Sequence, residues 1–312
     1  MTDFPVDTYL EGLVDMHCHS GPSPMPREFD HAEGARDGWD RLRMRALVAK
    51  CHHHNTQMDV LSQKSLLADI PTEVIGAVAL NTTVGGLNLA QVQLCLGLGG
   101  KVVYLPTVSS GRHIDCHAEN LGFPTPTVTL TAERIEVVRD GEVVPELLPI
   151  FDEIAAHDAV LNGGHLHPED IAVCFAAARE RGVTKFVVSH PDFVLGAEPS
   201  QCAQFVENGA MIEHELHMYD PGAKMRWPLE QLLEWIRALG PENTLIGSDL
   251  GQAGFPRPVD AFRRVGQGLM DLGLSGEDLR LIVHDNPRRL LGLTDTSDDA
   301  AAGSAQSAHS MA

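Results

Sequence analysis

Short apolar runs recur along the chain and alternate with stretches that have the periodicity of amphipathic helices. Runs rich in β-branched residues predict buried strands. They lie at 12–20, 45–54, 73–81, 101–107, 159–165, 185–191, 210–217 and 244–252. Eight strands alternating with helices predict an α/β fold, a (β/α)8 TIM barrel, in one catalytic domain over residues 1–293. The alternative, an open doubly wound sheet, is disfavoured because no Gly-rich phosphate loop follows the first strand.

The alternation of strands and helices is interrupted after the fourth strand. Residues 108–147 are rich in Gly, Pro and Thr at their start, and Asp140-Gly141 then separates two short runs. This dipeptide favours the tight turn of a β-hairpin. We expect the insertion to form a lid over the barrel mouth. Residues 294–312 consist mainly of Ala, Ser, Asp and Gly, and we expect a disordered tail.

Acidic residues outnumber basic ones by 43 to 23, which gives a formal net charge of −20. This charge disfavours nucleic acid and anionic membranes as partners. The sequence shows neither a transmembrane run nor a signal peptide. The six cysteines have no CxxC spacing, so we expect reduced thiols and a cytoplasmic protein. The oligomeric state stays open, with a homo-oligomer as one option.

Many of the 16 histidines stand where the apolar runs end. His17 and His19 are two residues apart at the end of the first run, and positions i and i+2 of a strand point to one face. The HxH motif is short enough to arise by chance. Parallel barrel strands, however, all end at one mouth. The strand ends therefore predict a cluster of His17, His19, His52, His165, His190, Glu213 and Asp249.

Imidazoles and carboxylates that converge on one point bind transition metals, and this number of donors favours two metal ions. Such a site can activate water for hydrolysis or, with iron, bind and reduce dioxygen. Each residue also has a structural alternative. Asp249 could cap a helix, Glu213 could bond to a neighbouring backbone, and His52 lies in a solvated-looking run of histidines. His113, in the insertion, is either a capping ligand or a surface residue.

The motif Asp15-Met16-His17-Cys18-His19, followed by His165, by His190 in Ser-His-Pro and by Asp249 in Ser-Asp-Leu, resembles the amidohydrolase superfamily of TIM-barrel metal enzymes. The resemblance spans nearly the whole barrel. One departure concerns the fourth strand, which ends Tyr104-Leu105-Pro106-Thr107 without the bridging carboxylated lysine or glutamate of that superfamily. A second is the strand-two sequence Lys50-Cys51-His52-His53-His54. A nitrogen-rich site of this kind suits iron.

With Leu80-Asn81, Val84-Gly85-Gly86-Leu87-Asn88 and the hairpin, the altered pattern is similar to a smaller group of amidohydrolase-like barrels. That group includes the non-haem di-iron monooxygenase of platensimycin and platencin biosynthesis. The resemblance implies two iron ions, O2, an electron donor and hydroxylation of an apolar small molecule, a terpenoid or acyl group carried on coenzyme A. The implied ligands are His17, His19, His52, His165, His190 and Asp249, with Glu213 or His113 completing the second ion and with Lys50 and His167 orienting ligands or passing protons.

The main alternative is a metal-dependent hydrolase of an amide, lactone or related bond. Asp249 would then be the general base, and the metal would be zinc or manganese. A third hypothesis is a catalytically silent barrel that serves as a scaffold and binds metal loosely or not at all. For the phosphates of coenzyme A, the candidate cations near the mouth are Arg112, Lys224 and Arg226.

Overall fold

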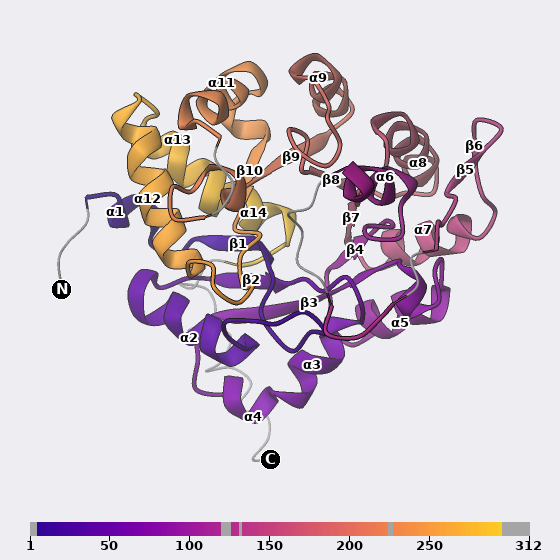
Figure 1. Ribbon diagram of the computed structural model, residues 1–312, viewed down its shortest axis with the longest axis horizontal. Helices are drawn as coiled ribbons and strands as arrows, with labels where there is room; N and C mark the ends of the chain where they lie inside the picture. The colour runs from indigo at the N-terminus through magenta and orange to yellow at the C-terminus, as the bar shows by residue number, and fades with distance from the viewer. Residues whose placement is uncertain (1–4, 120–125, 131–132, 224–226, 295–312) are drawn as a thin grey trace, which may run out of the picture.

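The computed structural model describes residues 5–119, 126–130, 133–223 and 227–294 (Figure 1). Eight parallel strands form one sheet, in which each strand pairs with the next one along the chain. They are β1 (Val14–Cys18), β2 (Ala46–Ala49), β3 (Glu73–Ala79), β4 (Val102–Tyr104), β7 (Val160–Asn162), β8 (Lys185–Ser189), β9 (Ala210–Glu215) and β10 (Thr244–Gly247).

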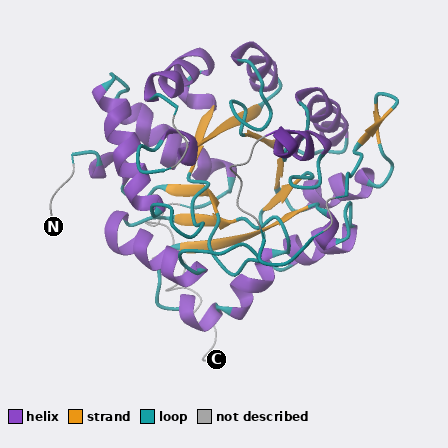
Figure 2. Cartoon of the chain, viewed as in Figure 1, coloured by secondary structure: helices purple, strands orange, loops and turns teal. Residues whose placement is uncertain are grey.

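Helices surround the strands, as Figure 2 shows. They are α1 (Asp7–Leu10), α2 (His31–Leu42), α3 (Thr56–Ser62), α4 (Lys64–Leu67), α5 (Leu89–Gly97), α6 (Gly111–Glu119), α7 (Leu147–Ala156), α8 (Pro168–Glu180), α9 (Pro199–Glu207), α10 (Leu216–Tyr219), α11 (Leu229–Leu239), α12 (Pro258–Asp271), α13 (Gly276–Arg280) and α14 (Asn286–Leu290). Within the described ranges, none of them is both long and apolar enough to cross a membrane. The six cysteines are all free thiols.

The first and last strands meet and bring the sheet round into a barrel. His19 N donates to Leu250 O at 2.8 Å, and Asp249 N donates to His17 O at 2.7 Å. The (β/α)8 TIM barrel predicted from the sequence is therefore confirmed. All eight strands are shorter than predicted; β9, for example, ends at Glu215 because α10 begins at Leu216.

The predicted hairpin after β4 is also confirmed. It consists of β5 (Val138–Arg139) and β6 (Glu142–Val143), and Asp140 and Gly141 turn the chain with φ angles of 53° and 82°. The hairpin contacts α8 and lies at the edge of the molecule in Figure 1. The same insertion contains α6, which reaches the barrel mouth. Residues 120–125 and 131–132 of the insertion and the tail from 295 lie outside the described residues, so the lid and the disordered tail stay predictions.

Side chains fill the fold in two layers. Inside the barrel, small and medium apolar residues such as Val14, Ala46 and Val160 pack around Tyr104. Between strands and helices, larger side chains form two further clusters, in which Phe262 is one buried member. The interior is therefore a packed core, which leaves the strand ends as the place for chemistry.

A bulge in β1 decides which side chains reach the mouth. Asp15 pairs with Leu47 and Cys18 pairs with Ala49, so β1 advances three residues while β2 advances two. Such an insertion reverses the alternation of the strand locally. Met16 belongs to the barrel interior like Val14, two residues earlier, and because of the bulge His17 also points inward, toward the mouth.

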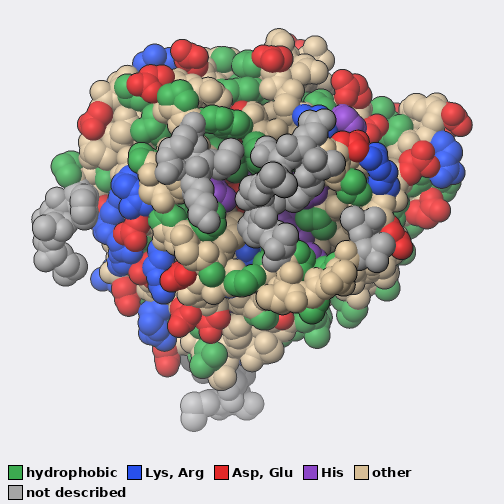
Figure 3. Space-filling model, in the orientation of Figure 1, with side chains coloured by type: hydrophobic (Ala, Val, Ile, Leu, Met, Phe, Trp, Pro, Cys, Tyr) green, Lys and Arg blue, Asp and Glu red, His purple; other side chains and the backbone are tan. Residues whose placement is uncertain are grey.

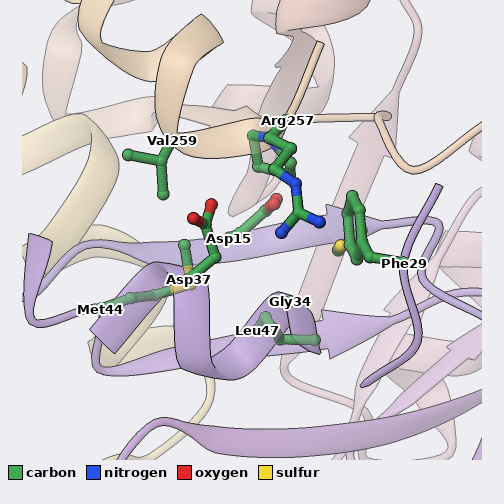
Figure 4. Close-up of a pocket in the computed structure, with 10 residues that line it drawn as sticks. Asp15, Phe29, Gly34, Asp37, Met44, Leu47, Arg257 and Val259 are labelled. Carbon is green, nitrogen blue, oxygen red and sulfur yellow. The ribbon is translucent and has the colours of Figure 1, made fainter. Parts of the chain in front are cut away.

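Asp15 holds this bulge in place from the outer side of β1. Its Oδ1 accepts hydrogen bonds from His17 N at 3.1 Å and from Ser248 N at 2.9 Å, so it ties β1 to the end of β10. The residue borders a small cavity between the strand and α2, close to Phe29 and Arg257 (Figure 4). Burial raises the pKa of Asp15 to about 6. Its Oδ2 is buried without a partner in the described chain.

We therefore predict that Asp15 makes the metal-free protein less stable as the pH rises. A carboxyl group whose pKa is higher in the folded state than in the unfolded state costs stability once it ionises. Unfolding free energies from urea titrations should fall between about pH 4 and pH 6 by roughly 3 kcal/mol relative to Asp15→Asn, which still accepts both hydrogen bonds.

Asp15→Ala serves as the contrasting variant. It leaves two buried N–H groups without an acceptor and should lose about 2–4 kcal/mol of stability at every pH. If Asp15→Asn unfolds as readily as Asp15→Ala at pH 7, or follows the wild-type pH profile, the assigned role of Asp15 is wrong.

Candidate metal centre

Five imidazoles form a closed ring at the carboxyl ends of the strands. The distances between ring centroids are 5.4 Å for His17 and His19, 5.1 Å for His19 and His52, and 5.5 Å for His52 and His165. The ring closes through His190, which lies 5.1 Å from both His165 and His17. Histidine side chains are visible near the centre of the face in Figure 3. The residues come from the ends of β1, β2, β7 and β8, as the sequence predicts.

Hydrogen bonds to one nitrogen fix the orientation of two of these imidazoles. His19 Nδ1 donates to Lys50 O at 3.0 Å. His52 Nδ1 lies 2.8 Å from Thr107 Oγ1, which also accepts from Asn81 Nδ2 at 2.7 Å. The amide of Asn81 in turn donates to His52 O at 2.8 Å. The bond to a carbonyl selects the tautomer of His19 and leaves its Nε2 available as a ligand, while the bond to Thr107 fixes the orientation of the His52 ring.

The remaining imidazoles are held by partners from other elements. His165 Nδ1 lies 2.7 Å from Nδ1 of His113 on α6, and the two rings stack at 4.8 Å. His165 Nε2 is buried without a partner in the described chain. His190 has a left-handed backbone with φ 53°, and its N–H donates to the Glu215 carboxylate at 3.1 Å. Its Nδ1 is 3.1 Å from Glu215 Oε2.

Carboxylates border the ring on the side of β9 and β10. Glu213 Oε2 accepts from Ser189 Oγ at 2.5 Å and lies 3.2 Å from His17 Nδ1. Asp249 adopts φ 51° directly after β10, and its Oδ1 is 2.9 Å from His19 Nε2 and 3.5 Å from His17 Nε2. Asp249 does not cap a helix, because α12 begins only at Pro258.

Burial controls the charge of these groups. It lowers the pKa of His19 to about 3 and that of His190 to about 4, and it holds the pKa values of His17, His52 and His165 well below the usual range. Burial acts to raise the pKa of Asp249, but the neighbouring imidazoles of His19 and His217, 2.9 and 3.6 Å from its carboxylate oxygens, hold that pKa well below its usual value. Neutral imidazoles beside an ionised carboxylate are the donor set of a divalent transition metal.

The pair formed by His19 and Asp249 shows that this place favours a cation. His19 carries its proton on Nδ1, so the lone pair of its neutral Nε2 faces a carboxylate oxygen at 2.9 Å. Two acceptors repel each other at this distance unless a positive charge lies next to them. The buried Lys50 supplies one such charge, with Nζ 2.8 Å from His17 Nε2 and 4.8 Å from the centroid of Tyr104. Burial lowers the pKa of Lys50 to about 8.

The structure brings together all but one of the site residues predicted from the sequence. His17, His190 and Asp249 offer ligand atoms within 4.8 Å of one another, as do His17, Glu213 and Glu215. His167 differs, because it directly precedes α8 with an exposed side chain, and none of its described contacts is with the ring. It contacts solvent because Pro168 starts the helix there and turns the chain outward.

Sequence reasoning missed Glu215, although a signal for it was present. Glu213 and Glu215 are two residues apart on β9, and the argument that placed His17 and His19 on one face applies equally to them. The roles of Asn81 and Thr107 carried no such signal, because they act on His52 from the ends of other strands. Of the cations considered for coenzyme A, Arg112 donates to Val194 O at 2.8 Å, and Lys224 and Arg226 lie outside the described residues.

The barrel is similar in fold to solved structures, one of which is described as an amidohydrolase. The chain itself belongs to a family described as a family of unknown function (DUF6282), whose model matches residues 12–213. No curated protein matches the sequence.

Solved structures share the fold at low sequence identity. An amidohydrolase from Pseudomonas aeruginosa has a TM-score of 0.61 at 12% identity, over 91% of this chain and 97% of its own. A β-aspartyl dipeptidase from Fervidobacterium islandicum has a TM-score of 0.58 at 16% identity, over 91% and 73%. The phosphotriesterase homology protein of Escherichia coli has a TM-score of 0.53 at 13% identity, over 90% and 98%. At these identities the likeness is one of fold.

We predict that metal binding depends on His165 and is independent of His167. Metal-free protein should be dialysed against zinc or manganese and its metal content measured. His165→Ala should weaken binding by more than about 100-fold, since even partners of metal ligands contribute 10–100-fold. His167→Ala, two residues away, should bind as the wild type does. Equal losses in both variants, or in neither, would contradict this site.

Proposed function

We propose that the protein is a metal-dependent hydrolase that cleaves an amide, lactone or related bond of a small molecule. The observation that carries the proposal is the short contact between neutral His19 and ionised Asp249 within the ring of imidazoles. It unites a cation site with a base at the mouth of the barrel, where TIM-barrel enzymes carry out their chemistry. The structural neighbours described as an amidohydrolase and a dipeptidase support the same class.

We assign the ligands from the contacts of each side chain. One ion would be held by His17, His190 and Asp249, whose donor atoms converge, with His19 beside them. Glu213 and Glu215 belong to this side, because both approach His17 Nδ1, at 3.2 and 3.6 Å. A second ion would be held by His52 and His165, and His113 rather than Glu213 would complete it, because His113 lies against His165. The buried Nε2 of His165, without a partner among the described residues, fits the second ion, and the buried Oε1 of Glu213, likewise without one, fits the first.

The residues around the ring can divide the proton transfers of hydrolysis between them. A divalent ion bound there would polarise the scissile carbonyl and make a water molecule acidic. Asp249 is ionised and can accept the proton of that water. Lys50 has a pKa of about 8, holds a proton at neutral pH and can deliver it to the leaving group.

Asp249→Asn should separate catalysis from metal binding. The amide removes the base but keeps an oxygen that can ligate, so turnover of a responsive amide or lactone should fall about 10²–10⁴-fold, while the metal content stays close to that of the wild type. Asp158→Asn, which changes an exposed aspartate, is the matched control. Turnover retained in Asp249→Asn would refute its role as the base.

A second candidate is a non-haem di-iron monooxygenase. It is favoured by the position of His52 in the ring, which makes the site rich in nitrogen, and by Tyr104 at the end of β4, where an anionic bridge would stand. This activity would require iron, O2 and an electron donor, with an apolar terpenoid or acyl substrate linked to coenzyme A.

Metal analysis of protein expressed without added metal should distinguish the two candidates. The hydrolase proposal predicts zinc or manganese and an absorption spectrum that does not respond to air. About two irons per chain, with an oxygen-sensitive spectrum that His52→Ala abolishes, would establish the monooxygenase instead.

A further inference from the structure

One arginine beside the metal centre, Arg27, forms no ion pair with a carboxylate of the described residues. Arg27 lies in the loop that follows β1, and its Nε and Nη2 atoms are buried without a hydrogen-bond partner in the part of the chain that the structure describes. Buried N–H groups of a guanidinium that lack acceptors are unfavourable in the absence of a ligand.

Backbone hydrogen bonds fix the position of this arginine relative to Asp249. Glu28 N donates to Gly251 O at 2.9 Å, and Ala253 N donates to Pro26 O at 3.1 Å. Arg27 thereby pairs in antiparallel fashion with Gln252, three residues after Asp249. The loop that carries Arg27 is thus attached to the loop that carries Asp249.

The electrostatic surroundings place the guanidinium close to the ring. Burial lowers the pKa of Arg27 from its usual value, and Cys51, Asp249 and Cys18 act against this effect. Arg27 in turn contributes to the lowered pKa of His19. A guanidinium stays charged under such conditions. A positive charge therefore lies near the two residues that carry the proposed chemistry.

The lack of a carboxylate partner for Arg27 among the described residues suggests a ligand, because acidic residues are abundant in this chain. They outnumber basic residues by 43 to 23, and many arginines of the described chain form ion pairs. These are Arg41, Arg45, Arg134, Arg139, Arg181, Arg263 and Arg264. Arg27 forms no ion pair with any carboxylate in the described ranges, although Asp249 is one of the charges that act on it.

The free atoms of Arg27 have the geometry of a carboxylate site. Nε and one Nη form an edge of the guanidinium that donates two parallel hydrogen bonds to a carboxylate. Gln252, on the same face of the ribbon, donates from Nε2 to Asp249 O at 3.0 Å, and its Oε1 is buried without a partner among the described residues. The pair offers two donors for an anion and one acceptor for a neighbouring hydroxyl or N–H.

We propose that Arg27 binds a carboxylate group of the substrate beside the metal centre, so that the protein acts on small carboxylic acids whose scissile bond lies close to the carboxylate. This inference rests on the hydrolase function proposed above. It explains how a chain with a net charge of −20 attracts an anion, since the positive charge is local and buried next to the reacting groups.

Binding to metal-free protein tests this carboxylate site without any catalysis. Calorimetry with benzoate, benzamide and inorganic phosphate should show that benzoate binds and that the neutral amide does not. Arg27→Gln should weaken benzoate binding at least 30-fold. Arg27→Lys, which keeps the charge but loses the bidentate edge, should weaken it about tenfold. Arg41→Gln, which changes an arginine paired with Asp260, should bind as the wild type does.

Three results would overturn the inference: equal benzoate binding by wild type and Arg27→Lys, no benzoate binding by wild type at millimolar concentration, or tighter binding of phosphate than of benzoate. Failure of the hydrolase proposal would look different. If the metal-loaded protein binds benzoate through Arg27 but cleaves no amide or lactone, the carboxylate site is supported and the proposed hydrolase function is contradicted. If the protein cleaves methyl esters of such acids as fast as the free acids, the hydrolase function is supported and the carboxylate site is contradicted.

Discussion

The site depends on the join between the first and last strands of the barrel. Asp249 N donates to His17 O at 2.7 Å, and Ser248 Oγ donates to the same carbonyl at 3.0 Å. Asp15 reinforces the join by accepting from both His17 N and Ser248 N. Apart from the bond between Asp15 and His17 N, these bonds connect residues more than 200 positions apart in the sequence and place the two ends of the metal centre next to each other. Any change that opens the join separates His17 from Asp249.

Burial gives the site its chemical character. Desolvation keeps the imidazoles neutral, and the neighbouring imidazoles of His19 and His217 keep Asp249 ionised despite its burial. A cluster of this kind carries unsatisfied acceptors that water cannot reach, and it is stable only with a cation nearby. Lys50 supplies one positive charge and Arg27 another, and both point to chemistry with anionic groups.

Much of the fold and many of the candidate ligand residues can be predicted from the sequence, but the side chains that orient those ligands cannot. Apolar runs that alternate with helical stretches define the barrel, and parallel strands place their ends at one mouth, so His17, His165, His190 and Asp249 are found by position alone. Partners that act across strands are not predictable in this way. Thr107 orients His52 and Ser189 holds Glu213 only because neighbouring strands adopt a particular register.

His167 is predicted to lie at the site but lies away from it, and the cause is again the local structure of the chain. His167 is two positions after His165, but the strand has ended there, and the i, i+2 rule no longer applies where the chain enters α8. In β1, the bulge between Asp15 and Cys18 also breaks simple alternation, yet the rule holds for His17 and His19 because both come after Met16, where the alternation changes. The features that need tertiary structure are thus the bulge, the cross-strand partners and the buried Arg27.

The most direct test of the central claim is the location of the metal by anomalous diffraction from crystals grown with zinc or manganese. The account predicts an anomalous peak inside the ring of imidazoles, bonded to His17, His190 and Asp249, with Lys50 Nζ displaced from His17 Nε2. Peaks only at exposed histidines such as His167 or His157, with Lys50 still bonded to His17, would contradict it.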